Sequence, residues 1–253
     1  MKQFSIIVPL FNNYVVVKRC IKSLIDHAKE AQVILYDDNS TDPNFVRHIQ
    51  NQIKDAKHIK LYLSKKNLGF TKTCNNASKI ADRDFLLFLN SDAFLNSKSL
   101  TELYKGVSRD NRIAVFGPMT CSTSSEQHIH NIYDSRFKWT DLDIEKYAEQ
   151  LSKNNQEYSP IDIKLVGGFA FGVKRDAFIQ LNSFDQDFED YGGEKEFCIR
   201  VRKAGYRTSY IKHAYIHHLG KMTYSTVDVN IGMKQVEGDR LIEKKHGPNW
   251  RNL

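Results

Sequence analysis

Short apolar runs alternate with segments of helical periodicity through the first 116 residues of this chain. The runs cover residues 5–10, 33–36, 59–63, 85–89 and 113–116, and the helical segments begin near residues 14, 43, 71 and 100. Strands that alternate with helices predict an α/β fold with a mainly parallel central sheet flanked by helices. Right-handed crossovers then place the carboxyl ends of the strands on one rim of the sheet.

Polar and acidic residues follow three of these predicted strands. Pro9 is expected to end the first strand, because proline cannot continue a central strand. Asp37 and Asp38 follow the second, and Asn-Ser-Asp at residues 90–92 follows the strongly apolar run 85–89, which is predicted to be buried on both faces. Ligands bind beyond the strand ends of open α/β sheets, so we predict that these clusters converge at one crevice. Taken alone, residues 90–92 suit a simple turn as well as a metal or phosphate site.

Length and composition limit the class of protein. The 253 residues suit one large α/β domain with at most a modest appendage. The apolar start is too short for a signal peptide, and no apolar run approaches the roughly 20 residues of a membrane span. The four cysteines are scattered without a CxxC pair, which is typical of free thiols in a reducing compartment. We therefore expect a cytoplasmic protein.

The basic charge balance indicates an anionic partner. The formal net charge is +7 and the isoelectric point is near 9.1. A phosphorylated small molecule fits this charge, and peripheral contact with an anionic membrane is an alternative. No dense basic arm with interleaved aromatic residues occurs, so nucleic acid is the least favoured partner. The basic stretch at residues 195–207 is interpreted as a solvated helix face.

The second half of the chain has a weaker pattern. Periodicity is blurred between residues 120 and 160, which predicts an insertion or a mobile region. A strand is then expected from Ile163 into Gly167 and Gly168, and further elements follow. These are helices at 174–182 and 194–204, one or two strands within 207–217, and an outer helix at 232–245.

Carboxylates and histidines are the remaining candidates for chemistry. No GxGxxG, GxxxxGK[ST] or GxSxG motif occurs, which removes the main sequence support for dinucleotide-binding, P-loop and hydrolase functions. Adjacent His217 and His218 point to opposite faces of a strand, so at most one shares a metal with Asp92. One carboxylate and one imidazole, completed by diphosphate oxygens and water, suit Mn²⁺ or Mg²⁺. Glu194, in the first turn of a helix, either complements the helix dipole or acts as a general base.

Six segments resemble, in order, those of the family 2 glycosyltransferases, which have the Rossmann-like GT-A fold. They are SIIVPLFNN, VILYDDNSTD, KNLGFTKTCNNA, FLLFLNSDAFL, VGGFAFGVKRDAF and FDQDFEDYGGEKEFCIRVRKAGY, and YIHHLGK follows. The likeness covers residues 4–221 and implies a single GT-A domain over residues 1–253. Within it, residues 1–118 would bind the nucleotide sugar, 119–222 would form a smaller acceptor and catalytic half, and 223–253 a helical tail.

The resemblance implies transfer of one sugar, with inversion, from a nucleotide-diphosphate sugar, UDP-linked, to a hydroxyl of a glycan or lipid-linked acceptor. Nine residues would bind the donor: Pro9, Phe11, Asp37, Asp38, Asn67, Gly69, Asn75, Ser91 and Gly168. Asp92, with His217 or His218, would bind Mn²⁺ or Mg²⁺ as a Lewis acid. Three acidic residues are implied on the catalytic side: Glu194 as the base, and Asp190 and Glu196.

Two positions depart from the family pattern. Asn90 stands at the first position of the DxD-type motif, and Gly193-Glu194 stands where the family has Glu-Asp. The pair Glu189-Asp190 is therefore an alternative source of the base. Two other functions stay open: a weakly active or inactive nucleotide-sugar-binding module, and a nucleotidyltransferase-like enzyme. The second would need a glycine-rich, basic loop after the first strand, which residues 10–14 do not supply.

Overall fold

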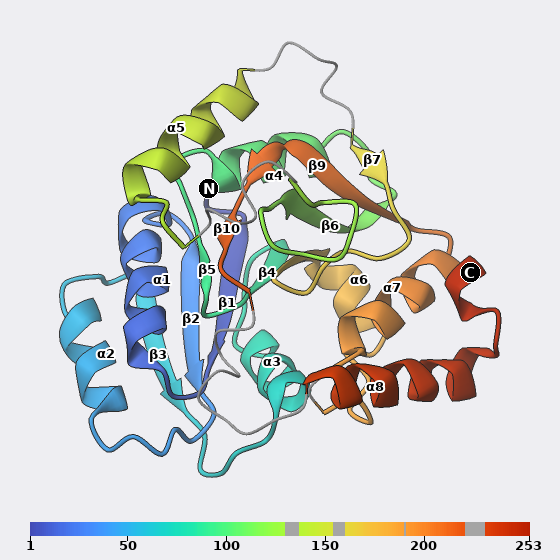
Figure 1. Ribbon diagram of the computed structural model, residues 1–253, viewed down its shortest axis with the longest axis horizontal. Helices are drawn as coiled ribbons and strands as arrows, with labels where there is room; N and C mark the ends of the chain where they lie inside the picture. The colour runs from blue at the N-terminus through green and yellow to red at the C-terminus, as the bar shows by residue number, and fades with distance from the viewer. Residues whose placement is uncertain (130–136, 154–159, 190, 221–230) are drawn as a thin grey trace.

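A central eight-stranded sheet carries helices on both faces in the computed structural model, which describes residues 1–129, 137–153, 160–189, 191–220 and 231–253 (Figure 1). In spatial order its strands are β3 (Ile59–Leu63), β2 (Gln32–Asp37), β1 (Phe4–Leu10), β4 (Phe85–Leu89), β8 (Ala170–Lys174), β6 (Ile113–Met119), β9 (Arg207–Tyr215) and β7 (Ile161–Asp162). Strands β1 to β4 are mutually parallel, and so are β6 and β9. Only β8 and the edge strand β7 run antiparallel to their neighbours. The predicted α/β fold with a mainly parallel sheet is confirmed.

Two layers of helices enclose the sheet. They are α1 (Tyr14–His27), α2 (Phe45–Ile53), α4 (Ser99–Val107) and α5 (Asp141–Ser152) on one face, and α3 (Phe70–Ser78), α6 (Arg175–Gln180) and α7 (Gly193–Lys203) on the other. The strongly apolar strand β4 shows why two layers form. Phe85, Leu87 and Leu89 belong to the first core, whereas Leu86 and Phe88 belong to the second. All five side chains are buried, so the predicted two-sided burial of this strand is confirmed. Burial of each such side chain contributes about 1.5–3 kcal/mol to stability.

The C-terminal helix α8 (Ile231–His246) packs on the outside of α7, as predicted, and a short helix η3 (Trp250–Asn252) follows it (Figure 1). Ile199 of α7, Ile242 of α8 and Trp250 of η3 form a small apolar cluster with Phe188. Among the described residues, no helix combines the length and the apolar character that crossing a bilayer requires.

Three expectations from the sequence are corrected. Within the stretch expected to be an insertion, α5 is a regular helix whose N-cap Thr140 forms a capping box with Asp143. Residues 163–168 are not a strand, and β8 begins only after the two glycines, at Ala170. Strand β1 also continues through Pro9 to Leu10, because its pairing with β4 ends at Ile7 and needs no further N–H on that side.

Candidate active site

The carboxyl ends of β1, β2 and β4 form one edge of the sheet. Leu10 of β1 is in register with Asp37 of β2, and the N–H of Asp38 donates to the Leu10 carbonyl at 2.8 Å. Ile7 is in register with Phe88, which brings residues 90–92 to the level of the end of β1. The structure therefore brings the acidic clusters together as predicted. Pro9 and Phe11 are half-buried at this edge, and Ser91 is buried beside Asp92.

Asp37 and Asp38 are buried carboxylates held by backbone and hydroxyl groups. Asp38 accepts hydrogen bonds from the N–H groups of Leu68 and Gly69, at 2.8 and 2.9 Å. Asp37 accepts one from the Ser40 hydroxyl at 2.5 Å. Burial raises the pKa of both carboxyls, and these hydrogen bonds oppose that rise. Asp38 thus ties the end of β2 to the loop that begins α3.

The predicted donor residues of the third segment shape this same loop. Exposed Asn67 accepts a hydrogen bond from the N–H of Gly69 at 3.2 Å, and Gly69 adopts a φ of 80°, which favours glycine, directly before α3. Asn75 is buried, and its amide is engaged with Phe184: Nδ2 donates to the carbonyl at 2.8 Å and Oδ1 accepts from the N–H at 3.1 Å. Asn75 therefore braces α3 against the segment that leads into α7.

Asp92 and His218 meet through a second, small sheet. Strand β5 (Ala93–Phe94) pairs antiparallel with β10 (His217–His218), and this pairing sets His218 opposite Ala93. His218 Nε2 lies 3.2 Å from Asp92 Oδ1, while its Nδ1 lies 2.6 Å from the Ser122 carbonyl. The carbonyl can only accept, so Nδ1 carries a proton and Nε2 is the ring nitrogen that faces Asp92. Among the described residues, the buried Nε2 has no hydrogen-bond partner beyond this ion-pair contact with Asp92.

This arrangement fits a divalent metal. Histidine ligands commonly donate the second ring N–H to a carbonyl, which orients the ring, and the Ser122 carbonyl accepts that bond here. In the described parts of the chain, no group of three or more His, Cys, Asp or Glu side chains could hold a metal ion. Asp92 and His218 would thus supply two ligands, and oxygen atoms from outside the chain would supply the rest.

His217 faces the opposite side, as expected for neighbours on a strand. Its Nδ1 lies 2.8 Å from the Tyr215 hydroxyl, and its ring lies between those of Phe94 and Trp139, with centroids 6.0 and 5.8 Å away. The side chain is fully buried. The structure therefore brings His218, and not His217, to Asp92.

Glu194 lies at the start of α7, directly above Gly168. A Cβ atom at Gly168 would stand 2.3 Å from Glu194 Oε1, so only glycine leaves room for this carboxylate. Burial raises the pKa of the Glu194 carboxyl. A half-buried carboxylate with a raised pKa is a candidate general base.

Two short segments join the predicted metal and base positions. Phe169, next to Gly168, accepts a hydrogen bond from the Asn90 N–H at 2.9 Å and stacks on the His218 ring at 5.1 Å. On the other side, the Thr71 N–H of α3 donates to the Glu189 carbonyl at 3.0 Å, just before α7. These contacts link the Asp92–His218 pair, Glu194 and the start of α3.

The other acidic candidates lie elsewhere or outside the described residues. Glu196 is buried and accepts hydrogen bonds from Arg200 at 2.8 Å, and His246 of α8 lies 3.1 Å away. These contacts direct Glu196 toward α8, away from Gly168. Asp190 lies outside the described residues. A Cβ at Gly193 would meet Thr71 Oγ1 at 3.2 Å, which accounts for glycine at this position of the motif.

Ser122 and Phe169 are site residues that the sequence reasoning missed. Ser122 acts through its backbone carbonyl, which carries no side-chain signal, and it is far from His218 in sequence. Phe169 directly follows the glycines at which the sequence predicted a strand to end, and its stacking on His218 depends on where β8 begins.

Comparison with known proteins decides the family. The model of glycosyl transferase family 2 matches residues 5–181, which is more than half of the chain. The chain belongs to this family. A GalNAc(5)-diNAcBac-PP-undecaprenol beta-1,3-glucosyltransferase of Campylobacter jejuni is 27% identical over 219 residues, covering 86% of this chain and 63% of that protein. A poly(ribitol-phosphate) beta-N-acetylglucosaminyltransferase of Staphylococcus aureus is 28% identical over 121 residues, covering 46% and 36%.

Solved structures confirm the GT-A fold of this family 2 member. GalNAc-T7 with UDP, GalNAc and Mn²⁺ matches with a TM-score of 0.67 at 16% identity, over 85% of this chain and 43% of that one. Staphylococcus aureus TarS 1-349 with UDP-GlcNAc matches with a TM-score of 0.65 at 17% identity, over 96% and 66%. The chain spans less than two thirds of the length of the two relatives named above.

Proposed function

We propose that this family 2 protein transfers one sugar from a nucleotide-diphosphate sugar, UDP-linked, to a hydroxyl of a glycan or lipid-linked acceptor. The main support for this function is the arrangement of two pairs of residues: His218 faces Asp92, and Glu194 lies over Gly168. Phe169, which follows Gly168 and stacks on His218, links the two pairs. The bound ligands of two structural neighbours, UDP with Mn²⁺ and UDP-GlcNAc, support the donor class. Undecaprenol and poly(ribitol-phosphate) in the names of two relatives support the acceptor class.

The first 118 residues would bind the donor. The uracil and ribose would lie at the edge formed by Pro9, Phe11, Asp37 and Asp38, and the diphosphate near residues 67–69. The N-terminus of α3 suits a nearby anionic group, because helix N-termini carry partial positive charge. Ser91 and Gly168 would lie near the sugar.

Asp92 and His218 would hold Mn²⁺ or Mg²⁺. When bound, the ion would act as a Lewis acid that stabilises the departing nucleoside diphosphate. The Ser122 carbonyl would orient the imidazole through Nδ1, and Phe169 would stack on the ring and restrict its rotation.

Glu194 would act as the general base. Its carboxylate would take the proton of the acceptor hydroxyl while that oxygen attacks the anomeric carbon in line with the leaving group. The new glycosidic bond forms as the bond from the anomeric carbon to the phosphate oxygen breaks. The electron pair leaves with the nucleoside diphosphate, and the anomeric configuration inverts.

Asp92→Ala tests this function most directly. Lewis-acid stabilisation contributes several kcal/mol, so we expect transfer to fall by about 10³-fold. The assay measures nucleoside diphosphate release from a panel of nucleotide sugars, with Mn²⁺ and with EDTA. We expect the circular dichroism spectrum to be unchanged.

Asp26→Ala is the matched control, because Asp26 is an exposed carboxylate on α1. It should keep full transfer. Normal turnover by Asp92→Ala would contradict the assignment of the metal site, and donor binding without any turnover in the wild type would favour an inactive binding module.

A further inference from the structure

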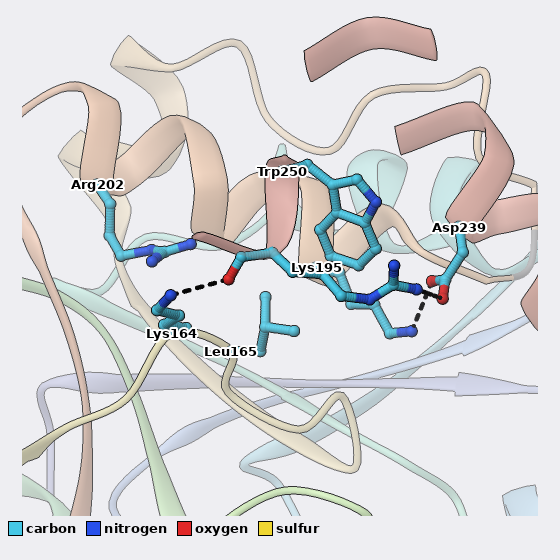
Figure 2. A pocket seen from close by; sticks show the side chains of 7 residues that line it. Lys164, Leu165, Lys195, Arg202, Asp239 and Trp250 are labelled. Carbon is cyan, nitrogen blue, oxygen red and sulfur yellow. Dashed lines mark hydrogen bonds and ion pairs between the residues drawn. The ribbon is translucent and has the colours of Figure 1, made fainter. Parts of the chain in front are cut away.

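A cavity of about 220 Å³ lies beside α7, next to α8 and η3 (Figure 2). It is open to solvent and is lined by Leu165 and six polar or aromatic residues: Lys164, Lys195, Arg202, Asp239, Trp250 and Arg251. None of these residues belongs to the predicted donor, metal or catalytic sets. A water molecule occupies about 30 Å³ in the liquid, so the cavity is large enough for a phosphate or diphosphate group.

The lining of this cavity has an excess of positive charge. Among the described residues that line it, four side chains are cationic and one, Asp239, is a carboxylate. Lys195 and Arg251 each pair with Asp239, at 2.9 Å. Lys164 and Arg202 are left without a carboxylate among the described residues.

The two remaining cations point toward the same space. Lys164 Nζ donates to the carbonyl of Arg251 at 2.9 Å, and Arg202 Nε donates to the carbonyl of Cys198 at 3.4 Å, both neutral acceptors. Both side chains line the cavity together with Trp250, as labelled in Figure 2. Burial lowers the pKa of the Arg202 guanidinium, as expected where no anion compensates the charge.

We propose that this cavity binds a phosphate or diphosphate group of the acceptor. Guanidinium and ammonium groups are the protein groups that bind phosphate best, and the free donors of Arg202 and Lys164 supply both kinds. The proposal rests on the proposed function for its acceptor. It departs from the sequence interpretation of residues 195–207 as a solvated helix face, since Lys195 and Arg202 line a cavity instead.

Helix α7 connects this cavity to the candidate base. Lys195 directly follows Glu194. Arg202 lies about 12 Å from Glu194 along the helix axis, at 1.5 Å per residue. An acceptor hydroxyl at Glu194 and an acceptor phosphate in the cavity would therefore lie along the same helix. The intervening distance suits a phosphate carried about one or two sugar units away from the reacting hydroxyl.

The first experiment titrates inorganic pyrophosphate into the protein by calorimetry, with EDTA present and UDP saturating, so that the donor site is filled. We expect wild type to bind, and Arg202→Gln and Lys164→Gln each to weaken binding about tenfold or more. Lys54→Gln, which removes an exposed cation after α2, should bind as wild type does. Absence of binding in wild type, or equal binding by both cavity variants, would overturn the site.

The second experiment compares two acceptors: a sugar linked to a short prenyl chain through a diphosphate, and the prenyl glycoside without phosphates. We expect wild type to have the lower KM for the diphosphate form, and Arg202→Gln to reduce that KM ratio toward one. An unchanged ratio would overturn the acceptor assignment. Pyrophosphate binding with no transfer to any acceptor would contradict the proposed function, but it would still support the cavity as an anion-binding site.

Discussion

The donor side and the catalytic side of the candidate site hold their carboxylates in different ways. On the donor side, Asp37 and Asp38 accept hydrogen bonds from hydroxyl and backbone groups of adjoining loops. On the catalytic side, Asp92 faces a histidine from a distant strand, and Glu194 rests on the backbone of Gly168. Asp37 and Asp38 therefore stabilise the loops that adjoin them, whereas Asp92 and Glu194, the candidate catalytic carboxylates, are positioned by residues distant in sequence. Substitutions on the donor side should therefore lower the free energy of unfolding, and substitutions on the catalytic side should mainly lower kcat.

Glu194→Gln should give the largest difference between the loss in kcat and the change in stability. Loss of the general base should lower kcat by about 10²–10⁴-fold, with little change in donor KM. Because burial raises its pKa, Glu194 contributes stability at acid pH that is lost as pH rises through the raised folded-state pKa. We therefore expect the variant to melt at a higher temperature than wild type above that pKa, with a gap that closes at acid pH. Wild-type kcat should fall as pH drops through the same pKa, above the usual range for glutamate.

Glu196→Gln is the control for this prediction, since it removes a carboxylate from the same helical turn. Glu196 pairs with Arg200 and His246, so its loss should lower stability and leave kcat within a few-fold. A kcat loss as large as that of Glu194→Gln would contradict the assignment of Glu194, and not Glu196, as the base.

Gly168→Ala probes the placement of the base without removing it. The new methyl group would overlap Glu194 Oε1, and the flexible end of Glu194 would move rather than the backbone. Misplacing a reacting group by about 1 Å costs about 10²-fold in kcat. Steady-state kinetics measure the loss, and a double-mutant cycle with Glu194→Gln tests its cause. Additive effects of the two changes would show that Gly168 does not act through Glu194.

Asp38→Asn should give the smallest effect and the opposite balance. The amide would present N–H toward the N–H groups of Leu68 or Gly69, and the free energy of unfolding should fall by about 1–2 kcal/mol. Urea denaturation measures this, with Asn67→Ala as a control because exposed Asn67 makes one local hydrogen bond. A stability equal to wild type would show that Asp38 does not anchor the loop.

The sequence predicted the N-terminal half of the fold better than the rest. Apolar runs such as residues 85–89 and polar residues just after them are local signals, and parallel strand order turns them into a common edge. It missed α5, whose Thr140 cap stood in a polar stretch, and it placed a strand before Gly168 instead of after it. Those elements are decided by packing against distant strands, which no short window of sequence contains.

By itself, the sequence determined the alternating α/β order, the family and the set of acidic residues from which a site could be built. The tertiary structure decided how those residues are used. It turned His218 rather than His217 to Asp92, placed Glu194 over Gly168, and bound Glu196 to Arg200 and His246. The physical reason is that strand pairing, close backbone approach and ion pairing join residues far apart in the chain, and each outcome depends on the space that the remaining side chains leave.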